Sequence, residues 1–257
     1  MGRIEGIATI TMVAAAAAYA AAFGLLLARR RRAGFAVFVV GWGLNAALVA
    51  LNWVAGGHPP FGNMYHVMVF LSLCFLPLYL LLRRREGLGW LHLYFAAAAV
   101  VPLAGALFME RDILWRRMPA LHSPWFVPHV VSYMISYALA AVAFALTVAG
   151  RVRRVGKEYA DASYAVLRFA FPFMTFGLLS GALWAEEAWG AYWSWDPKET
   201  WSLITWTAYV ACFHCRSAPR LRPGADLVQA LAFLALLTTF LLVNLLPKLA
   251  SVLHGYA

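Results

Sequence analysis

The densest group of chemically distinctive residues lies between residues 184 and 201, where the sequence is WAEEAWGAYWSWDPKETW. We call it the tryptophan stretch. Its aromatic side chains are Trp184, Trp189, Tyr192, Trp193, Trp195 and Trp201. Aromatic residues at this density are typical either of the belt that membrane proteins place at the lipid headgroups or of a flat surface for a large planar apolar ligand. Composition alone leaves both interpretations open.

The second half of this stretch has the pattern of a helix start. Asp196, Pro197 and Glu199 are the residue types expected at the N-cap, the first and the third positions of a helix. A structural role therefore accounts for these residues without any function. It does not account for the aromatic sequence WGAYWSW that precedes them.

The composition indicates what kind of protein must position these side chains. Of the 257 residues, 63% are hydrophobic and 12% are charged, and the mean hydropathy is +0.72. Soluble domains carry about 25% charged residues, so the sequence predicts an integral membrane protein. Its net charge of +10 lies in short clusters between apolar runs, and we therefore expect no nucleic-acid partner.

Apolar runs long enough to cross a bilayer divide the chain into regular segments. Eight such runs lie near residues 4–28, 35–54, 61–82, 90–108, 127–150, 166–184, 201–216 and 226–247. They predict an all-α, polytopic membrane helix bundle that forms a single domain over residues 1–257. Basic clusters such as Arg29–Arg32 and Arg83–Arg85 fall mostly in alternate connections, which the positive-inside rule assigns to the cytoplasm. Both termini and the tryptophan stretch are then expected outside.

Three histidines are candidate ligands in this arrangement. His129 and His254 are both expected at the depth of the tryptophan stretch, and imidazole is a common axial ligand of haem iron. His214 is expected about 20 Å along the seventh span from Trp201, and a histidine inside a span is a functional candidate. A lone histidine is more often a hydrogen-bonded core or interface residue, and the spacing leaves that alternative open.

The order of residues in this region resembles a known family. The sequence WGAYWSWDPKETWSLITW is similar to the tryptophan-rich WWD signature of the CcsA/ResC type of cytochrome c biogenesis proteins, which handle haem in System II. The CcmC type shares WG and WD but usually departs after the aspartate, where this chain keeps PKETW. The resemblance extends to SPW…HV around His129 and to the LHGYA tail at His254, although Gly255 replaces a serine.

The resemblance implies a set of functional residues. It implies that haem b is both substrate and bound ligand, with iron ligands at His129, His254 and His214. The aromatic residues that would bind haem beside them are Trp184, Tyr192 and Trp201. The residues that would take part in presenting haem for attachment are Trp189, Trp193, Trp195 and Asp196.

The resemblance also implies an activity and partners. We expect haem export, haem presentation and covalent attachment of haem to the CxxCH segment of an apocytochrome c. The enzyme would be a holocytochrome c synthase, with this chain as its CcsA-type subunit beside a CcsB/ResB-type membrane partner. The expected site is a bacterial-type plasma membrane or a thylakoid-like membrane, in contact with its lipid. A CcmC-like protein, or a haem transporter without synthase chemistry, remains the alternative.

The roles of two further histidines are not assigned by the sequence. His66 stands where relatives often carry glutamate, and it could orient a haem edge or bond within an outer cavity. His92 is at a depth compatible with a ligand opposite His214, but an interface residue is the simpler interpretation.

Overall fold

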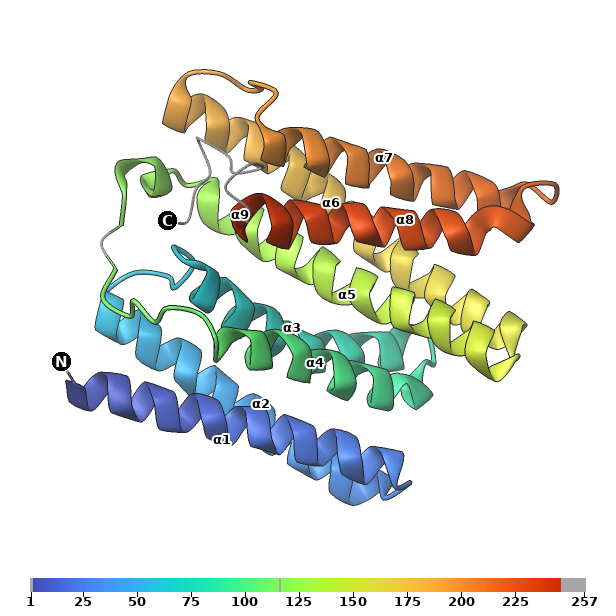
Figure 1. Cartoon of the computed structure of the whole chain (residues 1–257), viewed down its shortest axis with the longest axis horizontal. Helices are drawn as coiled ribbons and strands as arrows, with labels where there is room; N and C mark the ends of the chain where they lie inside the picture. Colours follow the sequence, from blue (N-terminus) through green and yellow to red (C-terminus); the bar gives the residue numbers. More distant parts are fainter. Residues whose placement is uncertain (1, 116, 246–257) are drawn as a thin grey trace. The chain divides into compact units, whose positions relative to one another are not determined.

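The computed structural model describes residues 2–115 and 117–245, and within these ranges the chain is helical, with no strand (Figure 1). Seven helices of this described part are long and apolar enough to cross a membrane. They confirm the prediction of a polytopic helical membrane protein. The side on which each terminus lies stays a prediction.

The exception among the eight predicted spans is residues 201–216. They lie in helix α7 (Pro197–Ser217), which is long enough to cross a bilayer but not apolar enough to count among the seven. The helix combines threonine and serine positions with His214 and Arg216 toward its end. These polar residues lower its hydropathy relative to its neighbours.

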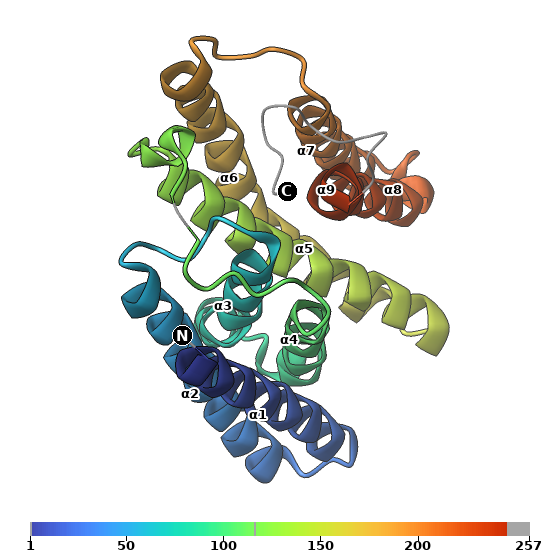
Figure 2. The same cartoon turned by 60° about the vertical axis from the view of Figure 1, so that its left-hand side comes forward.

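The contacts divide the chain into two compact units, Met1–Met118 and Pro119–Ala257. Single-domain organisation over residues 1–257 stays a prediction. The first unit contains helices α1 (Gly2–Leu27), α2 (Arg31–Gly56), α3 (Met64–Arg85) and α4 (His92–Ala106), with the 3₁₀ turn η1 (Gly89–Leu91) before α4. In this unit α1 packs against α2 and α4, and α3 packs against α4. Figure 2 shows these helices around one another in blue and green.

Close helix contacts in the first unit depend on small and amide side chains. A Cβ atom added at Gly41 would lie 2.9 Å from the Tyr19 ring, so the absence of a side chain lets α2 approach α1. Buried Asn45 donates from Nδ2 to the Val69 carbonyl of α3 at 3.2 Å. Such contacts are how helices associate where lipid offers no hydrophobic driving force.

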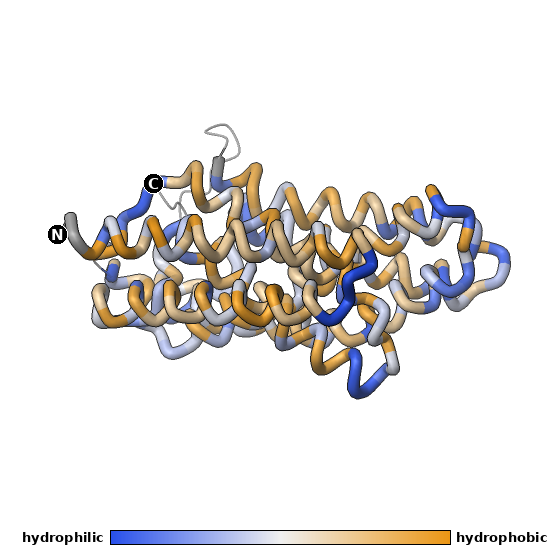
Figure 3. Tube along the Cα trace, turned by 90° about the horizontal axis from the view of Figure 1, so that it is seen from below, coloured by the Kyte–Doolittle hydropathy of each residue, from blue (hydrophilic) through white to orange (hydrophobic). Residues whose placement is uncertain are grey.

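The second unit is built from two helix pairs. Helix α5 (Phe126–Arg153) pairs with α6 (Gly156–Trp189), and α7 pairs with α8 (Ala225–Leu237). The π-helical turn η4 (Thr238–Leu242) and the short α9 (Val243–Leu245) follow α8, and the 3₁₀ turns η2 (Pro119–His122) and η3 (Arg222–Gly224) precede α5 and α8. Hydrophobic residues follow the helices and hydrophilic residues gather at their connections (Figure 3).

The helices of the second unit have ends of two kinds. The tryptophan end is where α5 begins, α6 ends and α7 begins. The basic end is where α5 ends, α6 begins and α7 ends, and it contains Arg151, Arg153, Arg154 and Arg216.

Candidate functional site

The tryptophan stretch consists of the end of α6, a short irregular loop and the start of α7. Helix α6 ends at Trp189, and Gly190 caps it in the left-handed conformation (φ 77°) with its N–H donating to the Glu186 carbonyl. Asp196 is the N-cap of α7, and its carboxylate accepts from the Lys198 N–H at 2.9 Å. The Glu199 carboxylate accepts from the Asp196 N–H at 3.2 Å, which completes a capping box. The predicted helix start is confirmed.

Glu199 does more than cap the helix, and this the sequence did not predict. Its carboxylate also accepts from the backbone N–H of Ser194 at 2.8 Å and from the Ser194 hydroxyl. The side chain is buried. One carboxylate therefore holds both ends of the turn that contains Trp195.

Trp195 has an unusual backbone conformation for its residue type. Its φ is 60°, in the left-handed region that non-glycine residues seldom adopt. The Thr200 hydroxyl donates to its carbonyl at 3.2 Å, and Glu199 holds its neighbours. The surrounding hydrogen bonds thus fix a conformation that turns a large side chain outward.

The aromatic side chains of the stretch fall into two groups. Trp184 is 4% exposed and its ring lies 5.2 Å from the ring of Trp189, measured between centroids. Tyr192 and Trp195 are 57% and 69% exposed, and Trp193 meets Trp195 edge to face at 5.9 Å. Trp184 is part of the packed core of the unit, and the half-buried Trp189 lies against it. The second group offers an apolar surface to a ligand or to lipid.

His129 belongs to the packed group. Its ring centroid lies 5.3 Å from that of Trp184 and 4.9 Å from that of Tyr133. Its Nδ1 lies 2.8 Å from the carbonyl oxygen of Gly177. Because a carbonyl only accepts, Nδ1 carries the proton, and the lone pair of the neutral ring is on Nε2. A metal-binding histidine is held in this way, by a hydrogen bond from its second nitrogen, so His129 fits the role of an iron ligand.

Two glycines of α6 make room for this histidine. A Cβ atom at Gly181 would lie 2.7 Å from Cε1 and Nδ1 of His129, and one at Gly177 would lie 3.1 Å from Tyr133. Glycines four residues apart share one helix face, so this spacing was a readable signal of a close helix contact. It does not by itself say which residue would fill the space.

The chain before α5 is tied to the end of α6. Trp184 donates from Nε1 to the Ala120 carbonyl at 2.7 Å, and the hydroxyl of Ser123 donates to the Glu187 carboxylate. These contacts hold the start of α5, and with it His129, against α6.

Helix α7 is also tied to the end of the described chain. The ammonium of Lys198 donates to Asn244 Oδ1 at 3.1 Å, and the hydroxyls of Thr205 and Thr239 lie 3.2 Å apart. Thr239 is part of the π-helical turn, a feature that often occurs at functional sites. Removal from water lowers the Lys198 pKa to about 7, against an opposite effect of the Asp196 charge.

The predicted ligands do not all come together. The structure brings His129 beside Trp184, whose ring in turn contacts that of Trp189. His214 is exposed near the end of α7, at the basic end. Trp201 is half-buried in the first turns of α7. His254 lies outside the described residues.

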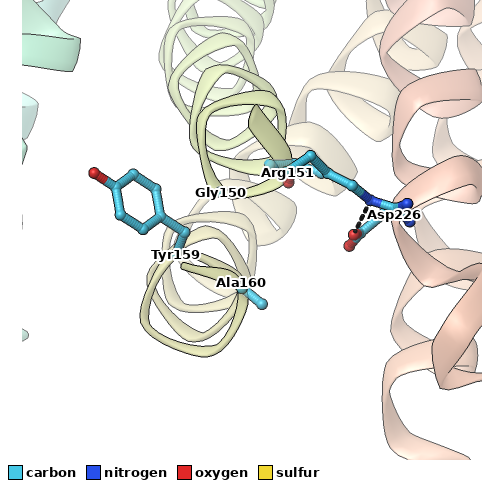
Figure 4. Close-up of a pocket in the computed structure, with 7 residues that line it drawn as sticks. Gly150, Arg151, Tyr159, Ala160 and Asp226 are labelled. Carbon is cyan, nitrogen blue, oxygen red and sulfur yellow. Dashed lines mark hydrogen bonds and ion pairs between the residues drawn. The ribbon is translucent and has the colours of Figure 1, made fainter. Parts of the chain in front are cut away.

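The basic end contains a polar network that the sequence did not predict. The buried hydroxyl of Ser163 and the amide of Gln229 bond to each other, and Arg216 donates to Gln229 Oε1 at 2.7 Å and to Asp226 at 3.3 Å. Arg151 also pairs with Asp226, at 3.0 Å, beside a cavity of about 110 Å³ (Figure 4). Four helices are joined here by side chains dispersed in the sequence.

The two remaining histidines of interest are in the first unit. The His92 Nδ1 donates to the Gly89 carbonyl at 2.9 Å in the turn before α4. His66 is buried in the first turn of α3.

Comparison with known proteins shows the family to which this chain is similar. The family described as Cytochrome C assembly protein matches residues 61–251. The proteins named Cytochrome c biogenesis protein CcsA from Guillardia theta and Mesostigma viride are 31% and 30% identical, over 86% and 83% of this chain and 86% and 82% of their own lengths. The CcsA of Chlamydomonas reinhardtii is 35% identical over 83% of this chain, but the match spans only 65% of that relative.

The matched family region covers most of the chain, including α3 to α8, His129 and the tryptophan stretch. The chain therefore belongs to the cytochrome c assembly protein family, as a member of its CcsA type.

Proposed function

We propose that this protein acts in cytochrome c biogenesis by presenting haem b for covalent attachment to an apocytochrome c. The observation that carries the proposal is the geometry of His129 in a chain of this family. Its ring is fixed by the Gly177 carbonyl so that Nε2 has the lone pair, and it lies against an aromatic group at the end of the unit that also carries the exposed Tyr192 and Trp195.

The residues of the tryptophan end would have different roles in binding haem. His129 would ligate the iron from one side, and His254 would supply the second imidazole. The exposed Trp195 and Tyr192, with Trp193, would cover an apolar face of the macrocycle, and aromatic burial of this kind stabilises a complex by several kcal/mol. Trp184 would pack against His129, with Trp189 against Trp184. Asp196 and Glu199 would keep the loop in place.

The chemistry that such a site promotes is mainly one of positioning. When bound, haem supplies two vinyl groups. Each cysteine sulfur of the CxxCH segment bonds to a vinyl carbon while a proton goes to the neighbouring carbon, so no external oxidant or reductant enters the balance of the bond. A site that holds haem in one orientation makes this addition effectively intramolecular. The protein contributes the orientation, and the apocytochrome contributes the nucleophiles.

The remaining assignments are proposals of the same kind. His214 would hold haem at the basic end before it reaches the tryptophan end, with the basic end toward the cytoplasm. A CcsB/ResB-type membrane partner would complete the synthase, in a bacterial-type plasma membrane or a thylakoid-like membrane. The exposure of His214 on α7 supports a ligand shared with a second component.

The test is formation of covalent cytochrome c in cells that contain this chain, a CcsB/ResB-type partner and an apocytochrome with CxxCH. Haem that survives denaturing electrophoresis measures the product. We expect His129→Ala to reduce it to background, and His122→Ala, at an exposed histidine of η2, to leave it unchanged. Normal product from His129→Ala would contradict the proposal. Haem delivered outside without a thioether bond would favour a transporter or a CcmC-like protein.

A further inference from the structure

A second group of histidines, in the first unit, is separate from the residues of the proposed function. His58 follows α2, His66 lies in the first turn of α3, and Trp115 follows α4. The ring centroids of His58 and His66 lie 4.4 Å and 6.3 Å from that of Trp115. We call these three residues the histidine pair and its tryptophan.

Three of the four ring nitrogens of this pair have no hydrogen-bond partner among the described residues. His66 is 1% exposed, and neither its Nδ1 nor its Nε2 has a partner within the described residues. The buried Nδ1 of His58 also has none. A buried polar atom without a partner costs about 1–3 kcal/mol, and here three such atoms lie on two rings that share one neighbour. This concentration indicates that something else occupies the partners' place.

The protonation of His58 is fixed by its other nitrogen. Its Nε2 lies 3.2 Å from the carbonyl oxygen of Trp115. Because the carbonyl accepts, Nε2 carries the proton and the orphaned Nδ1 has the lone pair. A histidine whose second nitrogen donates to a backbone carbonyl is oriented as metal-binding histidines are.

Several contacts place Trp115 beside the pair. A Cβ atom at Gly62 would lie 2.2 Å from the indole of Trp115, so only a glycine allows the ring to lie this close. Asn63 donates from Nδ2 to the Asp112 carbonyl at 2.9 Å, and Arg111 donates to the Thr9 hydroxyl at 2.5 Å. The segment before Trp115 is thus tied to both α3 and α1. The site is formed by the fold and does not depend on a single loop contact.

The chemistry of the pair selects the kind of ligand. Among the described residues, no group of three or more histidine, cysteine or acidic side chains could hold a metal ion, so an ion that requires three such ligands is not supported. Two neutral imidazoles without a carboxylate favour an ion of low charge, because an unneutralised divalent ion is costly to bury. Imidazole suits copper, Cu(I) is stable with two ligands, and an indole face attracts a cation.

We propose that His58 and His66 bind a single Cu(I) ion beside the indole of Trp115. The site does not depend on haem handling, so either proposal can fail without the other. His58 contributes Nδ1, and His66 contributes either nitrogen, with the other left to donate to water or backbone.

The experiment is an anaerobic Cu(I) titration of the detergent-purified full chain against the chelator bicinchoninate. Wild type is compared with His58→Gln, His66→Gln and the control His122→Gln. We expect each of the first two variants to bind one Cu(I) equivalent fewer than wild type, or to bind it at least about 100-fold more weakly. His122→Gln should match wild type. Copper held at other histidines is common to all four proteins and cancels in the comparison.

Two further measurements keep the test decisive. X-ray absorption at the copper edge should show that the equivalent lost in the variants has nitrogen neighbours and no sulfur. Trp115→Phe should still bind the Cu(I) equivalent, but more weakly. If His66→Gln does not fold, Trp115→Phe and His58→Gln, which changes a half-buried residue, test the site in its place. Equal Cu(I) uptake by wild type and both histidine variants would overturn the proposal and leave water as the partner of these nitrogens.

Discussion

The two ends of the second unit use polar side chains in opposite ways. At the basic end, Arg216, Asp226 and Gln229 mainly bond to one another and to Ser163, so side chains join α6, α7 and α8. The Arg151–Asp226 ion pair adds α5. At the tryptophan end, a backbone carbonyl holds His129, and Glu199 mainly holds backbone N–H groups, while Trp195 remains exposed. One end is thus closed by bonds between side chains, and the other keeps a large aromatic side chain exposed.

The largest effect is expected from Gly181→Ala. The added Cβ would lie 2.7 Å from His129, so the ring must move away from its place beside α6. We expect the purified variant to lose its bound haem absorbance to the level of His129→Ala. Gly43→Ala is the control, because nothing lies within 4 Å of a Cβ at that helical position. An unchanged haem spectrum in Gly181→Ala would show that haem ligation does not depend on the packing of His129 against α6.

The basic end should respond in stability and not in haem binding. Asp226→Ala leaves Arg216, whose side chain is 11% exposed, without its carboxylate. We expect a loss of about 2–3 kcal/mol in the free energy of unfolding, because Asp226 is itself partly exposed, measured by denaturation in mixed micelles. Arg151→Ala, at a 64% exposed side chain, should cost less than about 1 kcal/mol. A changed haem spectrum in Asp226→Ala would show that the two ends are coupled.

A smaller effect is expected from Glu199→Gln. The variant keeps the size of the side chain but loses the charge that holds Ser194 and the Asp196 N–H. We expect haem binding to weaken by about 1 kcal/mol, or roughly fivefold in Kd, in a fluorescence titration. Glu186→Gln makes the same chemical change at a side chain outside the loop and is the control. Equally weakened haem binding in both variants would show that the loss of a negative charge, and not the hydrogen bonds of Glu199 within the loop, causes the effect.

A pH dependence of the stability is expected from Lys198. Its pKa is lowered from 10.5 to about 7 in the folded protein, so the unfolded chain binds more protons between these values. The free energy of unfolding should therefore rise with pH from about 7 toward 10.5. Below pH 7 it should be lowered by the full cost of burying the charged Lys198 ammonium. Lys198→Met should flatten this rise in thermal midpoints recorded across that range. A parallel pH profile in the variant would show that Lys198 stays charged.

Much of the fold could be predicted from the sequence, because long apolar runs and capping patterns are local signals. The start of α7 at Pro197 and its capping box followed from three residues. The role of His129 as a ligand stays a prediction from the family resemblance, and the Gly177 carbonyl shows how its ring is held. The apolar run at 201–216 predicts a further membrane span. It lies in α7, whose polar positions keep that helix out of the seven apolar ones.

The missed features depend on residues that are distant in the sequence. The network of Ser163, Arg216 and Gln229 has no spacing to recognise, because it forms only when α6, α7 and α8 meet. The second role of Glu199 depends on the left-handed turn at Trp195. The histidine pair shares Trp115 as a neighbour, and that residue is distant from both histidines in the sequence.

The measurement that tests the central claim most directly is the absorption spectrum of the purified protein, oxidised and reduced, beside His129→Ala with and without added imidazole. We predict a low-spin spectrum for wild type, a high-spin or weakened one for the variant, and recovery of the low-spin spectrum when imidazole fills the place of the missing side chain. A variant with the wild-type spectrum and no response to imidazole would show that His129 is not an iron ligand.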